Sequence, residues 1–182
     1  MLETERLTLR ELTQHDAGFI VAQLNDPDFI RNVADRGVRT IEAARAYIES
    51  GPVASYRRHG FGLLLVELKG SRAPIGICGL IRREALDDVD IGFAFLPPYR
   101  SQGFALEAAT ATLNLARELG LSRVVAIVAP GNTDSIKLLG KLGFRRERQI
   151  RFGDAAEELE LFAATLEIRT DFPRYNNRDG AA

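Results

Sequence analysis

One segment constrains the fold of this chain more than any other: a strand that leads through a glycine-containing turn into a long helix. Residues 87–96 alternate apolar side chains with other residues, which is the pattern of a half-buried strand. Residues 97–105 read Pro-Pro-Tyr-Arg-Ser-Gln-Gly-Phe-Ala, and from Leu106 onward apolar residues recur at helical spacing until Gly120. The segment therefore predicts a sheet strand and a helix that packs on the same sheet.

The rest of the chain predicts a mixed α/β fold. Tight connections between three consecutive strands indicate an antiparallel meander, within the element order β-α-α-β-β-β-α-β-α-β-β. We expect a mostly antiparallel sheet flanked by helices, in a single domain of residues 1–168 with a polar tail at 169–182. The expected strands are residues 6–12, 61–68, 74–82, 87–96, 123–129, 144–152 and 157–166; further helices should follow Thr13, Thr40 and Asn132, and residues 26–39 should form a loop or short helical turns.

Composition excludes several classes of function. The 182 residues include 24 Lys and Arg against 25 Asp and Glu, so no net field attracts nucleic acid or an anionic membrane. A single cysteine, Cys78, and two separated histidines provide neither a disulfide nor the spacing of a metal site. We expect a cytoplasmic protein, since the first residues do not resemble a signal peptide and no apolar run is long enough to span a bilayer.

The turn at residues 100–105 is suited to binding a phosphate group. A strand-to-helix junction presents unpaired backbone N–H groups at the positive end of the helix dipole. Gly103 allows close approach of a ligand, and Arg100 can add charge-assisted hydrogen bonds. The segment matches neither the P-loop nor the Rossmann glycine pattern. It predicts capture of a pyrophosphate, and a protein that uses the turn to bind ATP or NAD remains an alternative.

These residues also resemble a known family. Arg100-x-x-Gly103-x-Ala105 matches the Arg/Gln-x-x-Gly-x-Gly/Ala pyrophosphate loop of the GNAT acetyltransferase superfamily. Residues 132–144 resemble the second cofactor segment of that family, and residues 2–10 resemble the opening strand of its ribosomal-protein-alanine acetyltransferase branch. The resemblance extends over residues 2–166. It implies the GNAT fold and the transfer of an acetyl group from acetyl-CoA to a primary amine.

The resemblance also implies a cofactor site. The expected pyrophosphate ligands are the side chain of Arg100 and the backbone amides of Ser101, Gln102, Gly103, Phe104 and Ala105. The strand that ends at Phe95 and Leu96 should part from the strand at 124–129 to admit the pantetheine arm, with a backbone N–H near Leu96 on the acetyl carbonyl. Asn132 should contact pantetheine and Ser135 the CoA sulfur. Many family members carry a tyrosine acid slightly further on, but residues 136–142 contain none, so Ser135 or a water must protonate the thiolate.

The reaction requires a base, because an α-amine has a pKa of ~7.7–8.0 and a lysine one of ~10.4. Asp90 is the first candidate, on the strand face opposite Phe93 and Phe95; Glu84 and His59 are weaker candidates. Cys78 in a short apolar strand is expected to be a buried core residue rather than an acyl-transfer nucleophile. We therefore expect direct attack in a ternary complex, with Asp90 and Ser135 as catalytic residues.

The sequence leaves open the acceptor, the choice between an enzyme and a binding module, and the oligomeric state. The acceptor could be a protein N-terminus or a small-molecule amine, held between residues 26–39 and the hairpin near Gly153. A non-catalytic acyl-CoA-binding regulatory module would retain Arg100, Gly103 and Asn132 but would not need Asp90 or Ser135. The sequence is compatible with a monomer or a homodimer.

Overall fold

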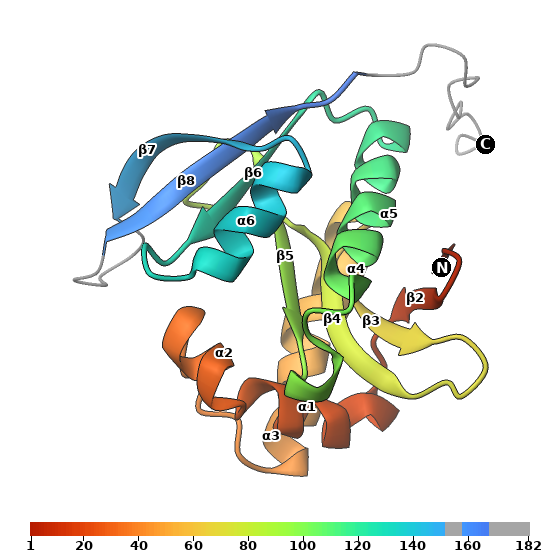
Figure 1. Ribbon diagram of the computed structural model, residues 1–182. Helices are drawn as coiled ribbons and strands as arrows, with labels where there is room; N and C mark the ends of the chain where they lie inside the picture. Colours follow the sequence, from red (N-terminus) through yellow and green to blue (C-terminus); the bar gives the residue numbers. More distant parts are fainter. Residues whose placement is uncertain (152–157, 168–182) are drawn as a thin grey trace, which may run out of the picture.

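A twisted sheet runs through the centre of the molecule (Figure 1). The structure is a computed structural model that describes residues 1–151 and 158–167, and within these the sheet has eight strands in the order β1-β2-β3-β4-β5-β6-β8-β7. All neighbouring strands are antiparallel except β5 and β6. The strands are β1 (Leu2–Glu3), β2 (Leu7–Glu11), β3 (Leu63–Leu68), β4 (Pro74–Ile81), β5 (Val89–Phe95), β6 (Arg123–Val128), β7 (Arg145–Arg151) and β8 (Glu158–Thr165). The expected mixed, mostly antiparallel sheet is confirmed.

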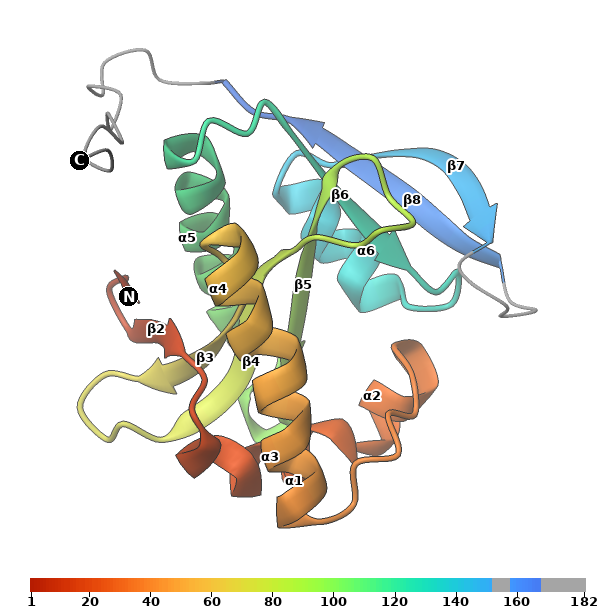
Figure 2. The ribbon, with the colours of Figure 1, turned by 180° about the vertical axis from the view of Figure 1, so that it is seen from behind.

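Helices cover both faces of the sheet. Those of the described residues are α1 (Ala17–Leu24), α2 (Pro27–Asn32), α3 (Ile41–Ile48), α4 (Ala54–His59), α5 (Phe104–Glu118) and α6 (Thr133–Lys141). Helices α5 and α6 pack on one face, whereas α1 and α3 pack on the other, as the view from behind shows (Figure 2). In the described part of the chain, none of these helices is long and apolar enough to cross a membrane.

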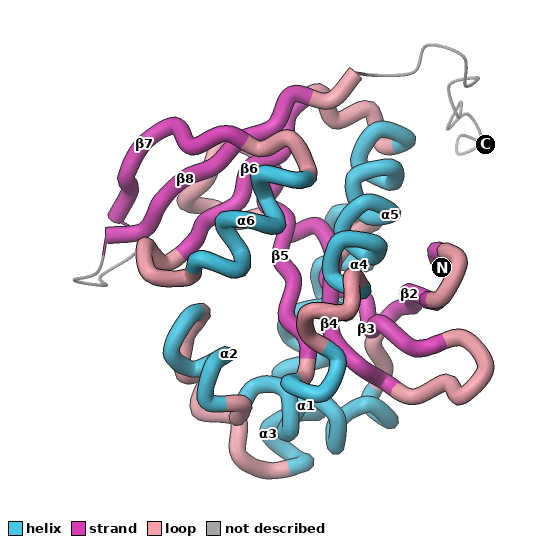
Figure 3. The backbone as a smooth tube through the Cα atoms, in the orientation of Figure 1, coloured by secondary structure: helices cyan, strands magenta, loops and turns pink. Residues whose placement is uncertain are grey.

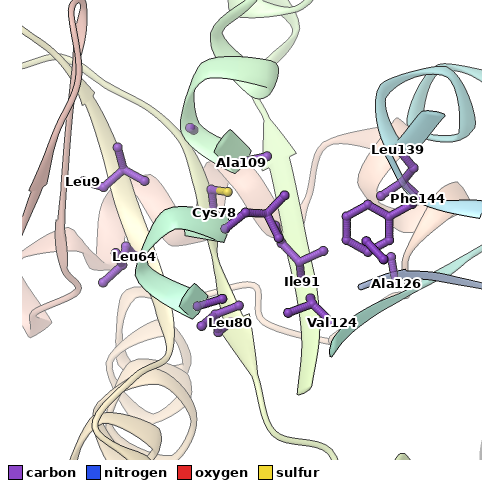
Figure 4. Close-up of a cluster of buried hydrophobic side chains, with 14 of the residues drawn as sticks. Leu9, Leu64, Cys78, Leu80, Ile91, Ala109, Val124, Ala126, Leu139 and Phe144 are labelled. Atoms are coloured by element: carbon purple, nitrogen blue, oxygen red, sulfur yellow. The ribbon is translucent and has the colours of Figure 1, made fainter. Parts of the chain in front are cut away.

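The main core lies between the sheet and α5 and α6 (Figure 4). Leu9, Cys78, Ile91 and Val124 extend from four different strands, and Ala109 on α5 closes the layer. Small side chains on α5 allow its backbone to approach the sheet closely, which fixes where the helix begins relative to the end of β5.

The helix boundaries have local causes that the sequence shows. Asp26 caps α2: its Oδ2 accepts a hydrogen bond from the Phe29 N–H at 3.1 Å, and Pro27 occupies the first helical position. Asn132 caps α6 in the same way, and Gly120 has the positive φ of 75° that a helix C-terminus favours. Residues 26–39, expected as a loop or short turns, thus contain a capped helix.

The structure contains features that the sequence did not predict, among them the short strand β1 ahead of the first expected strand. The helix predicted at 40–49 continues through a π-helical turn at Glu49–Val53 into α4, because Pro52 lacks the N–H that a regular turn would use. The closing hairpin inserts its second strand, β8, between β6 and β7. Its strands are antiparallel as expected, whereas the turn at Gly153 and the tail at 169–182 lie outside the described residues.

Candidate active site

The C-terminal ends of β5 and β6 diverge (Figure 3). A cavity of about 510 Å³ lies beside the end of β5. Pairing between these parallel strands ends at Asp90 and Val125. Parallel strands that part at their carboxyl ends leave a crevice of the kind that ligands occupy in α/β proteins. The walls come from β5 (Phe93, Ala94, Phe95), the following turn and α5 (Tyr99, Arg100, Ser101, Gly103, Ala105, Leu106), α6 with its cap (Asn132, Asp134, Ser135, Lys137, Leu138, Lys141), and α1 with the α2 segment (Gln23, Asp26, Asp28, Phe29, Arg31, Asn32, Val33).

The turn before α5 leads directly into the N-terminus of that helix and has an unusual backbone conformation. Ser101 and Gly103 have positive φ angles of 59° and 82°, and Gly103 is the N-cap of α5. Arg100, which precedes them, is extended, with φ −78° and ψ 161°. The first N–H groups of α5 have no partner within the helix, so they are available to an anion at its N-terminus. A serine in the left-handed region carries backbone strain, which is typical of a ligand-binding turn. Ser101, Gly103 and Ala105 line the cavity at the N-terminal, positive end of α5.

Two residues of the same turn do not line the cavity. Gln102 donates from its Nε2 to the Pro98 carbonyl at 2.7 Å, which braces the turn. Phe104 is buried under the Arg6 guanidinium, which lies 4.4 Å above its ring. Only their backbone groups, not their side chains, are suited to the cofactor contacts expected of them.

The side chain of Arg100, expected to bind a pyrophosphate, contacts groups of the protein instead. Its Nε donates to the Phe95 carbonyl at 2.8 Å, and its two Nη groups form ion pairs with Asp26 and Asp28. These contacts use three of the five N–H donors of the guanidinium and tie the N-terminus of α2 to the turn. The backbone N–H groups of the turn are thus better placed than the Arg100 side chain to carry a pyrophosphate.

The backbone donor expected at Leu96 is already engaged. The Leu96 N–H donates to the Ile75 carbonyl at 3.0 Å and so continues the ladder between β4 and β5. Because N–H groups alternate in direction along a strand, those of Phe93 and Phe95 point the other way, towards the gap beside β6. Leu96 is therefore not the donor in this structure. Phe95, also predicted, lines the cavity, and so does Phe93, which sequence reasoning missed.

Asn132 and Ser135 lie on the wall of the cavity that α6 and its N-cap form. The Asn132 Oδ1 accepts a hydrogen bond from the Ser135 backbone N–H at 3.2 Å. The cap uses only the oxygen of this amide, so its NH2 group is the part that can donate to a ligand. Both residues line the same cavity as the turn before α5, and their contacts with the cofactor stay a prediction.

Asp90 occupies the point at which β5 and β6 begin to diverge. Its side chain is 2% exposed, and its Oδ2 accepts a hydrogen bond from Arg83 Nε at 2.6 Å. Burial raises the pKa of Asp90 to about 6, although the charge and hydrogen bond of Arg83 and a hydrogen bond from the Ile127 backbone on β6 oppose the rise. A buried carboxylate that titrates near 6 has the properties of a general base. It does not itself wall the cavity, so it can accept a proton from an acceptor only through a water.

The weaker candidates lie elsewhere. Cys78 is fully buried against Thr112, with the sulfur 3.4 Å from Oγ1, and burial raises the pKa of this thiol to about 12. His59 ends α4 and stacks on Phe61, with ring centroids 5.7 Å apart. Neither His59 nor Glu84 is among the residues that wall the cavity. No group of side chains in the described ranges could hold a metal ion.

Known proteins that resemble this chain are acetyltransferases. The model of the acetyltransferase (GNAT) domain family matches residues 6–145. The uncharacterized N-acetyltransferase YoaA of Bacillus subtilis (strain 168) is 30% identical over 154 residues, which cover 83% of this chain and 86% of YoaA. A GNAT-family acetyltransferase of known structure from Bacillus anthracis is 27% identical, with a TM-score of 0.75 over 90% of this chain and 97% of the other.

Two solved structures are similar in fold at lower identity. The ribosomal-protein-S5-alanine acetyltransferase from Vibrio fischeri is 20% identical, with a TM-score of 0.72 over 90% of this chain and 94% of the other. The microcin C7 self-immunity acetyltransferase MccE, in complex with acetyl-CoA and AMP, is 16% identical, with a TM-score of 0.75 over the same shares. The chain belongs to the GNAT acetyltransferase family and is an acetyl-transferring enzyme. Enzymes of this family use acetyl-CoA.

Proposed function

We propose that this protein transfers the acetyl group of acetyl-CoA to a primary amine by direct attack in a ternary complex. The observation that carries the proposal is one cavity that joins the turn before α5 to the C-terminal end of β5 and to α6, where β5 no longer pairs with β6. The backbone N–H groups of residues 101–105 would hold the pyrophosphate. The pantetheine arm would then enter the gap, with the Asn132 amide beside it. A single domain of residues 1–168 carries this activity.

The chemistry follows from the groups around the gap. The amine nitrogen attacks the acetyl carbonyl carbon, and the oxyanion accepts a hydrogen bond from the backbone N–H of Phe95 or Phe93. A water passes the proton of the amine to Asp90. The carbon–sulfur bond then breaks, and the CoA thiolate leaves and takes a proton from water or from the Ser135 hydroxyl, which regains one from solvent. Asp90 returns its proton to solvent at the end of the cycle.

The acceptor side is bounded by the segment from Asp26 to Val33. This wall has acidic residues beside Arg31, and Val33 is half exposed, so it offers both polar and apolar contacts. The relative from Vibrio fischeri acts, by its name, on the alanine of a ribosomal protein. We propose a peptide N-terminus as the first class of acceptor to test and small-molecule amines as the second.

Turnover on a panel of amines tests the proposed function. Release of the CoA thiol would be followed with acetyl-CoA and two sets of acceptors: short peptides with a free N-terminal alanine or serine, and polyamines or amino sugars. Acetyl transfer to members of either set supports an acetyltransferase and identifies its acceptor class. CoA binding without product on the whole panel would contradict catalysis and would favour a regulatory acyl-CoA-binding module.

Replacing Cys78 with alanine separates direct attack from an acyl-enzyme. We expect kcat/KM to stay within about twofold of wild type, because the thiol is buried and protonated. Loss of the side chain from the core should cost on the order of 1 kcal/mol of unfolding free energy. Mass spectrometry after incubation with acetyl-CoA would show a protein without a covalent acetyl group; an acetylated Cys78 would contradict direct attack.

A further inference from the structure

The segment between β1 and β2 is fastened to the start of α5. The Arg6 Nε contacts Glu107 Oε2 at 2.7 Å, and the Arg6 backbone N–H donates to Glu107 Oε1 at 2.8 Å. The Arg6 Nη1 donates to the Gln102 carbonyl at 3.1 Å, and its guanidinium covers the Phe104 ring. One side chain, almost a hundred residues away in sequence, thus holds both the turn before α5 and the first turn of the helix.

The contact with the Gln102 carbonyl fixes the direction of the next N–H group. In a trans peptide the carbonyl of one residue and the N–H of the following residue point in opposite directions, and no cis peptide occurs in the described residues. The Gln102 carbonyl points to Arg6, so the Gly103 N–H points away from Arg6. Gly103 lines the cavity and Gln102 does not. Arg6 also packs closely against the turn, since a Cβ on Gly103 would lie 3.3 Å from Arg6 Nη2.

Arg6 also balances a charge that opposes anion binding. Glu107 lies in the first turn of α5, where a carboxylate is favourable for the helix dipole but would repel a pyrophosphate. Burial of Glu107 favours its neutral form, but hydrogen bonds from Thr4 and Arg6 outweigh this and lower the pKa of its carboxyl, so the charge is present at neutral pH. The Arg6 guanidinium neutralises that carboxylate at the site itself.

We propose that Arg6 is a positioning residue of the cofactor site: it orients the Gly103 N–H towards the pyrophosphate and neutralises Glu107 behind it. The role rests on the proposed function, since it requires a pyrophosphate in the turn. It predicts a defect specific to the part of CoA that contains the pyrophosphate. Pantetheine, which lacks that part, binds only in the gap between β5 and β6.

Titration calorimetry with two probes, CoA and pantetheine, tests this role. Arg6→Met keeps a long apolar stem over Phe104 but removes the charge and the donor to Gln102. We expect the Kd for CoA to rise about tenfold and the Kd for pantetheine to stay within about twofold. Arg6→Lys, which retains the charge and one donor, should restore part of the CoA affinity. Lys69→Met is the matched control, because Lys69 forms an ion pair with Glu3 at 3.2 Å in the same region without touching the turn.

Each outcome has a distinct meaning. An unchanged Kd for CoA in Arg6→Met would overturn the role of Arg6. An equal loss of affinity for both probes would also overturn it, because that result indicates general distortion. If Arg6→Met fails to fold, Arg6→Lys decides: a CoA-specific loss supports the role, and wild-type affinity contradicts it. If wild type itself binds CoA no more tightly than pantetheine, the proposed function fails, whatever the variants do.

Discussion

Replacing Gly103 with valine should weaken acetyl-CoA binding about 100-fold. Gly103 has a φ of 82°, a conformation that a β-branched residue avoids, and a Cβ there would meet Arg6 at 3.3 Å. The turn must therefore rearrange, and its N–H groups no longer converge on one anion. Loss of one or two charge-assisted hydrogen bonds, at about 1.5–3 kcal/mol each, corresponds to this factor, since 1.4 kcal/mol is tenfold. Calorimetric titration with acetyl-CoA measures it.

The matched control for this variant lies at the other end of the same helix. Gly120 has a similar φ of 75° at the C-terminal end of α5, and a Cβ there would meet nothing within 4 Å. Gly120→Val should lose as much unfolding free energy as Gly103→Val, on the order of 1–3 kcal/mol. It should keep the wild-type affinity for acetyl-CoA. If both variants bound acetyl-CoA equally well, the turn before α5 would not be the pyrophosphate site.

Replacing Asp90 with asparagine should lower kcat about 10²- to 10⁴-fold, the range typical of a lost general base. The KM for acetyl-CoA should change little, because Asp90 does not wall the cavity. In wild type, kcat/KM should rise with pH up to about 6, as the carboxyl ionises. The variant should lack this rise. Asp88→Asn is the control: Asp88 lies two residues earlier, and its carboxylate contacts Arg123 at 2.8 Å outside the cavity.

The same pKa makes a separate prediction for stability. Burial raises the pKa of Asp90 from 3.8 to about 6, so the folded state binds this proton more tightly than the unfolded state does. The stability of wild type relative to Asp90→Asn should therefore fall as the pH rises from about 4 to about 6, and level off above that. Denaturant unfolding of both proteins across this range measures the difference. If the difference in unfolding free energy stayed constant with pH, Asp90 would not titrate as proposed. In the kinetic experiment, a small loss of kcat in Asp90→Asn would exclude Asp90 as the base.

Local patterns predicted most of the elements. Tight connections between the strands now labelled β3, β4 and β5 predicted the meander, and the residues at helix ends, such as Asn132 and Gly120, predicted where helices begin and end. These features depend on neighbours within a few residues, so the sequence displays them directly. The position of β8 between β6 and β7 depends on how distant strands pair, and no local pattern contains that information.

The sequence predicted which residues gather at the cavity, but it did not predict which groups those residues contact. Arg100, Gly103, Asn132 and Ser135 do meet at one cavity. The engagement of Arg100 by Asp26 and Asp28 could not be foreseen, because it joins segments more than seventy residues apart. The direction of the Leu96 N–H depends on the strand register, since a shift of one residue exchanges the two sides of a strand.

The central claim, that this chain binds CoA at the turn before α5, is tested most directly by thermal unfolding with acetyl-CoA, CoA, ATP and NAD in parallel. A ligand present at a hundred times its Kd stabilises the folded state by ~2.7 kcal/mol, which for a chain of this size raises Tm by about 5–10 °C. We predict such a rise with acetyl-CoA and CoA, and none with ATP or NAD. A rise with ATP or NAD and none with the CoA species would contradict the assignment of the site.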